Sequence, residues 1–111
     1  MSKFDDFGNE IRAGVVNIAK GDLKDFLKEA KDDTNQFLAA TKEDLKTWTK
    51  QLADGDLSKD EFEFLLRGKE DLAEMHALTQ AGIAAAQIQK FRDALIDLVI
   101  DTAFKVFVPS I

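Results

Sequence analysis

Apolar residues recur every three or four positions along almost the whole chain, which is the spacing of one helix face. The first segment shows it clearly, with Phe4, Phe7, Ile11, Val15 and Ile18 in a row of such steps. No stretch alternates with the period of two that is typical of strands. The single proline, Pro109, lies close to the C-terminus and therefore interrupts no helix before it. The pattern predicts an all-α single domain over residues 1–111.

We predict three helices, over residues 3–20, 22–53 and 58–108, with a turn at 54–57. Asp22 is suited to cap the second helix. The turn before the third helix carries the clearest local signal, because Gly55 can end one helix and Ser58 can begin the next. Glu61 follows Ser58 by three positions, as a capping box requires.

The predicted third helix would be very long, about 75 Å at 1.5 Å per residue. The first two helices have about the same combined length, which allows a long antiparallel helical hairpin, a coiled coil in the broad sense. A four-helix bundle is the alternative if the third helix breaks near Gly82, or less readily near Gly68. A glycine costs a helix only about 1 kcal/mol, so neither glycine compels a break, and we favour the hairpin.

Residues 94–108 are apolar on about three quarters of the helix circumference, with Asp97, Asp101 and Lys105 forming one narrow polar stripe. Such a helix is normally buried from several sides, and the first helix alone cannot cover it. We therefore expect this segment to bury itself against other subunits. The predicted oligomer interface consists of Leu95, Leu98, Val99, Ala103, Phe104, Val106 and Phe107. A patch of small residues predicts close helix packing at Ala81, Gly82, Ala85 and Ala86.

Composition narrows the function classes. The net charge is -6, and no basic stripe is present to displace counterions from nucleic acid. The chain has no cysteine, which excludes disulfides and thiolate metal sites. It shows neither a signal peptide nor an apolar run long enough for a transmembrane span. We expect a cytoplasmic protein.

Few residues offer chemistry. Residues 54–62 resemble the second half of a calcium loop, but Lys50 and Leu52 occupy the positions of the first ligands and cannot bind calcium. His76 is the only histidine, and with Glu70 and Glu74 it could bind a metal only alongside a symmetry-related copy. No phosphate loop or nucleophile motif is present. We expect no enzyme activity, no cofactor and no metal.

The sequence leaves three function hypotheses. The first is a non-enzymatic structural protein that self-associates through its apolar C-terminal helix into a symmetric homo-oligomer or larger assembly. The second is an amphipathic-helix protein that coats a lipid or other apolar surface; in general character the chain resembles phasins and exchangeable apolipoproteins. The third is an acidic adaptor or inhibitor of a basic protein partner. We favour the first.

Overall fold

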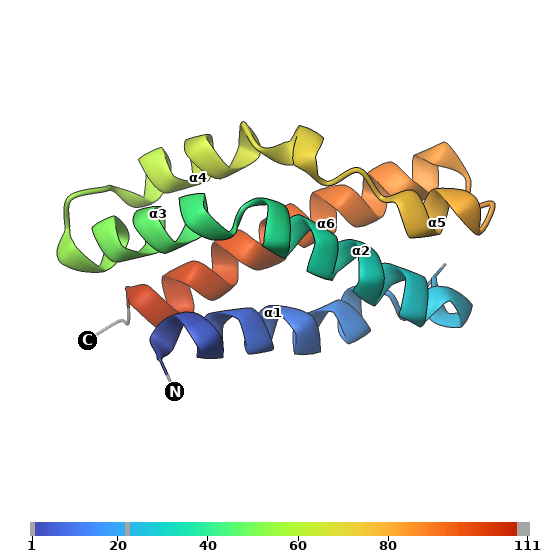
Figure 1. The fold of residues 1–111 in the computed structure, drawn as a ribbon, viewed down its shortest axis with the longest axis horizontal. Coiled ribbons are helices and arrows are strands. Elements are labelled where there is room, and N and C mark those ends of the chain that lie inside the picture. The colour runs from blue at the N-terminus through green and yellow to red at the C-terminus, as the bar shows by residue number, and fades with distance from the viewer. Residues whose placement is uncertain (1, 22, 109–111) are drawn as a thin grey trace.

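The computed structural model describes residues 2–21 and 23–108, and in these ranges every regular element is helical. The all-α prediction is therefore confirmed. The elements are α1 (Lys3–Ile18), η1 (Lys24–Phe26), α2 (Leu27–Ala40), α3 (Lys42–Asp54), α4 (Lys59–Arg67), η2 (Glu70–Leu72), α5 (His76–Gln80) and α6 (Ala85–Phe107), where η denotes a 3₁₀-helix. The helices lie roughly lengthwise in a molecule of 42 × 25 × 21 Å (Figure 1).

The predicted continuous helix over 58–108 is wrong, and with it the long hairpin. The chain leaves the helix after Arg67, passes through η2 and a short irregular stretch, forms the short α5, and turns again at Gly82 before α6. The predicted second helix is also divided, because α2 ends at Ala40 and α3 begins at Lys42. The chain does leave the helix near Gly68 and near Gly82, where the alternative placed a break, but with six α-helices in the described ranges a four-helix bundle is not confirmed. The proposed cap at Asp22 lies outside the described residues.

Burial explains why no helix runs through residues 73–75. Ala73 is 1% exposed and Met75 is fully buried. In a continuous helix these two residues would lie about 200° apart, at 100° per residue, so one face could not bury both. The non-helical backbone at 73–75 lets both side chains enter the core. Met75 adopts a left-handed conformation with φ 58°, which is costly for a residue other than glycine and is stable here only because the surrounding packing imposes it.

Asp33 on α2 holds the start of α5 in place. Its side chain is only 3% exposed, and its two carboxylate oxygens accept hydrogen bonds from the backbone N–H groups of Ala77 and Leu78, each at 2.9 Å. These donors belong to the first turn of α5, where a helix has no backbone acceptors of its own. Leu78 beside them is fully buried. A carboxylate more than forty residues away in sequence therefore caps α5.

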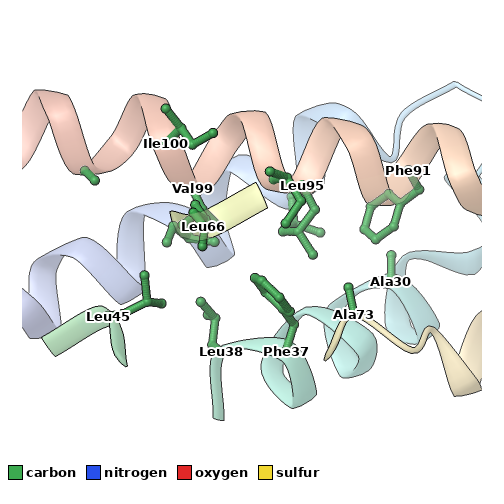
Figure 2. Close-up of a cluster of buried hydrophobic side chains, with 14 of the residues drawn as sticks. Ala30, Phe37, Leu38, Leu45, Leu66, Ala73, Phe91, Leu95, Val99 and Ile100 are labelled. Atoms are coloured by element: carbon green, nitrogen blue, oxygen red, sulfur yellow. The ribbon is translucent and has the colours of Figure 1, made fainter. Parts of the chain in front are cut away.

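The core surrounds α6, which packs against α1, α3, α4 and α5. Figure 2 shows side chains of α6 pointing toward those of α2, α3 and α4, among them Phe91, Leu95, Val99, Phe37, Leu38, Leu45 and Leu66. The contact with α1 is especially close, because a Cβ atom on Gly14 would lie 2.8 Å from a methyl carbon of Leu98. At one end of the molecule Phe7 meets Phe107 edge to face, with ring centroids 5.6 Å apart.

We predict that Asp33→Ala lowers the free energy of unfolding by about 2–3 kcal/mol, because two backbone N–H groups lose their acceptors in the interior. Asp33→Asn keeps one acceptor oxygen and is expected to lose less. Urea denaturation followed by circular dichroism measures both. Asp32→Ala is the matched control, since Asp32 is exposed on the same helix, and it is expected to change stability by under about 0.5 kcal/mol. Equal effects of the two alanine variants would contradict the capping role.

Candidate functional site

The predicted interface residues lie mostly inside the chain's own core. Leu95, Val99 and Ala103 are fully buried and Phe107 is 9% exposed, while Leu98, Phe104 and Val106 are half-buried and pack against the same core. The premise that one helix alone would lie beside this segment is wrong, because four helices of the same chain pack against α6. Whether a second copy also contacts α6 stays a prediction.

The small residues do not form a close helix contact within the chain. All four are exposed: Ala81, Gly82, Ala85 and Ala86. Gly82 has φ +87° and lies in the turn between α5 and α6, where a Cβ atom would meet no other atom within 4 Å. The left-handed backbone, and not a tight approach of another helix, accounts for a glycine at this position.

The polar stripe of α6 forms ion pairs with two neighbouring helices. Asp97 pairs with Arg67 of α4 at 2.9 Å, and Lys105 pairs with Glu10 of α1 at 3.1 Å. All four side chains remain well exposed, so each pair contributes little to stability. Asp101, the third residue of the stripe, is exposed and forms no ion pair among the described residues.

The candidate metal ligands also stay at the surface. His76 Nε2 lies 2.8 Å from a carboxylate oxygen of Glu74, and Glu70 accepts a hydrogen bond from Gln89. In the part of the chain that the structure describes, no group of three or more His, Cys, Asp or Glu side chains is arranged to hold a metal ion.

The most unusual surface feature is Phe64 on α4. Among the described residues it is the one large apolar side chain that is largely exposed, at 78%. It lies beside a shallow hollow of about 300 Å³, which is lined by Leu57, Asp60, Glu61, Phe64 and Leu65. We call these five residues the Phe64 surface. Leu57 and Leu65 are both half-buried, and Leu57 packs against the core.

The local sequence explains why Phe64 faces outward. The core takes Phe62 and Leu66, which are four positions apart on one face of α4 and fully buried. Phe64 is two positions from each, about 200° around the helix, and therefore falls on the opposite face. The same angular argument could have singled out Phe64 from the sequence, because it is the one apolar residue of this segment that does not fit the three-to-four spacing.

The start of α4 is fixed by the capping box at Ser58. The Ser58 hydroxyl accepts a hydrogen bond from the Glu61 backbone N–H at 3.1 Å, and the Glu61 carboxylate accepts one from the Ser58 N–H at 3.0 Å. The hydrogen bonds from Ser58, above all from its backbone, hold the pKa of Glu61 below its ordinary value. Glu61 therefore stays ionised beside Phe64. The preceding Gly55 ends α3 with φ 83°.

Charge around Phe64 is mainly negative. The two cations of α4 are engaged elsewhere, because Lys59 lies 5.4 Å above the ring of Phe104 and Arg67 pairs with Asp97 and Glu63. Asp60 and Glu61 remain on the Phe64 surface itself. The surface thus combines one exposed aromatic ring with carboxylates that have no cationic partner among the described residues.

Comparison of the chain with protein-family models, with curated proteins and with solved structures finds no match. In the described ranges, no helix is long and apolar enough to cross a membrane.

The variant Val99→Asp tests whether Val99 is buried in the core of its own chain or between two copies of the chain. We predict that the variant loses its cooperative unfolding transition and much of its helical circular dichroism, because an unpaired charge would replace a fully buried side chain. Asp101→Ala, on an exposed position of the same helix, is the control and should remain folded. A folded Val99→Asp variant with a smaller solution mass than the wild type would instead place Val99 between subunits.

The capping box makes stability depend on pH. Because the pKa of Glu61 is lowered on folding, its charge stabilises the fold at neutral pH, and this contribution disappears as the pH falls through and below the ordinary glutamate value of about 4.3. We therefore expect the difference in urea midpoint between wild type and Glu61→Gln to be larger at pH 7 than at pH 3. Ser58→Ala should lower stability by about 1 kcal/mol at pH 7 and by less at pH 3, because the Ser58 hydroxyl also contributes to the lowered pKa of Glu61. A Glu61→Gln difference that does not change with pH would contradict the assignment.

Proposed function

We propose that the chain is a non-enzymatic adaptor that uses the Phe64 surface to bind a basic, amphipathic segment of another protein. The observation that carries the proposal is the exposure of Phe64 beside carboxylates on a rigid helix. An aromatic side chain with a polar rim is typical of the residues that dominate protein interfaces. A partner helix with an apolar stripe and flanking lysines or arginines would complement both parts of this surface.

The structure of α4 supports this use. The capping box fixes the start of the helix that carries Phe64, so the backbone of this segment does not have to fold when a partner binds. Burial of the exposed ring against a partner would contribute favourable free energy to the complex. The fold itself does not depend on the ring, because Phe64 is largely exposed in the free chain. The acidic side chains would accelerate association with a basic partner and disfavour acidic ones.

Self-association through the same surface is less favourable. Two copies related by a two-fold axis would bring Asp60 and Glu61 of one close to those of the other, and each chain carries a net charge of -6. Like charges placed opposite each other cost free energy in an interface. Self-association through α6, as expected from the sequence, would need apolar side chains that the chain's own core already covers.

The proposal is tested by measuring how tightly the chain binds a short amphipathic helical peptide of leucine and lysine. We predict that Phe64→Ala weakens binding about tenfold or more, while the free energy of unfolding changes by under about 0.5 kcal/mol. Asp60→Asn should also weaken binding and reduce its dependence on salt. Asp71→Asn is the matched control, because Asp71 is exposed in η2 and does not line the Phe64 surface.

Two outcomes would overturn the adaptor proposal. One is equal affinity for the basic peptide and for a peptide in which glutamate replaces lysine, which would remove the role of charge. The other is a concentration-dependent solution mass, measured by light scattering, that Phe64→Ala abolishes. That result would make the Phe64 surface a contact between copies of this chain.

A further inference from the structure

A furrow between α1 and α2 is chemically different from the Phe64 surface. The two helices run side by side in opposite directions (Figure 1). Two hollows of about 430 and 350 Å³ follow one another along this seam, each within the size range of small-molecule sites. Arg12 and Asn35 line both hollows and separate them, joined by a hydrogen bond of 2.9 Å between Arg12 Nε and the side-chain oxygen of Asn35.

The sequence of the two helices explains the furrow. A row of residues four positions apart on α1 lines it, namely Phe4, Gly8, Arg12 and Val16. On α2 the corresponding row is Lys31, Asn35 and Ala39. Gly8 and Ala39 line the first hollow and contribute almost no side chain, which leaves space there. A Cβ atom on Gly8 would lie 3.1 Å from Arg12 Nη1, so the missing side chain also lets the guanidinium fold back along α1.

The furrow carries positive charge on an acidic protein. Arg12, Lys31 and Lys42 line it, and among the described residues none of them forms an ion pair. Arg12 is held by the neutral side chains of Asn9, at 3.3 Å, and Asn35, so its charge is oriented but not neutralised. Asp5 is the one carboxylate in the lining of the two hollows.

The lining of the first hollow combines this charge with an apolar wall. Phe4, Phe7, Leu38 and Leu45 line it together with Arg12. Arg12 Nη2 forms no hydrogen bond with a described residue. Nη2, together with the second hydrogen of Nη1, can therefore still donate hydrogen bonds to the oxygens of an anion. A guanidinium binds a carboxylate in a planar two-bond geometry that a lysine cannot offer.

We propose that this furrow binds a single amphiphilic anion, namely an acyl chain that ends in a carboxylate. The carboxylate binds the Arg12 guanidinium, and the acyl chain lies in the first hollow against the half-buried Phe4 and the exposed Ala39. The Arg12–Asn35 bridge crosses the furrow, so a partner helix about 10 Å wide cannot settle into it, whereas a slim chain can. The inference is independent of the adaptor function proposed above.

The test uses the full chain and sodium dodecanoate below its micelle concentration, with binding measured by isothermal titration calorimetry. We expect one dodecanoate per chain, and Arg12→Met should weaken binding about tenfold or more while removing little volume. Lys28→Met is the matched control, because Lys28 is exposed on α2 and does not line either hollow. It removes the same charge and should change affinity less than twofold.

A second variant tests the position of the acyl chain. Ala39→Leu places a larger side chain at the exposed wall of the first hollow and leaves Arg12 unchanged, so it should lower the affinity for dodecanoate as well. Circular dichroism checks that both variants remain folded. Phe64→Ala should bind dodecanoate like the wild type, which separates this site from the adaptor function.

Several results would overturn the proposal. Unchanged affinity in Arg12→Met and Ala39→Leu would remove the furrow as the site. Equal binding of dodecanoate and dodecanol would exclude recognition of the carboxylate by Arg12. Flotation of the chain with neutral vesicles, without binding of dodecanoate monomers, would indicate that a lipid surface is bound instead of a single amphiphile.

Discussion

The requirement to bury α6 determines where the other helices lie. This helix is apolar over most of its circumference and about 35 Å long at 1.5 Å per residue, so no single neighbour can cover it. Four helices of the same chain pack against it, and its two ion pairs to α1 and α4 leave its narrow polar stripe at the surface. The length of the molecule, 42 Å, is close to that of α6 because the other segments are folded back along it.

Folding back along α6 requires the chain to leave the helical path twice between α4 and α6, and the first break depends on a distant residue. Local signals allowed the all-α class, the approximate limits of the first helix and the start of α4 at Ser58 to be predicted, since each depends on residues within a few positions. The break at 73–75 depends on the burial of Met75 and on the Asp33 carboxylate, whose hydrogen bonds join α2 to α5. Helix propensity carries no information about them, which is why the sequence favoured one long helix.

For the candidate sites, too, the sequence could not predict features that depend on contacts between distant residues. Apolar periodicity indicated that residues such as Val99 are buried, but it could not tell whether the covering helix belongs to the same chain or to another copy. Phe64 is the opposite case, because its angular position on α4 was readable from its spacing to Phe62 and Leu66. The furrow was not readable at all. It depends on Gly8 and Ala39 lying on opposite walls of one hollow, and their approach is set by how α1 and α2 pack.

The net charge of -6 is therefore the sum over surfaces of opposite charge. Carboxylates dominate around Phe64, while Arg12, Lys31 and Lys42 line the furrow between α1 and α2. Both surfaces contain apolar side chains, so hydrophobic burial alone would not let them discriminate between ligands. Charge would, because a basic helix would be attracted to the first and repelled by the second, and an amphiphilic anion would behave in the reverse way. The separation of charge along the chain, more than its total, is what would let the two proposed surfaces bind different ligands without competing.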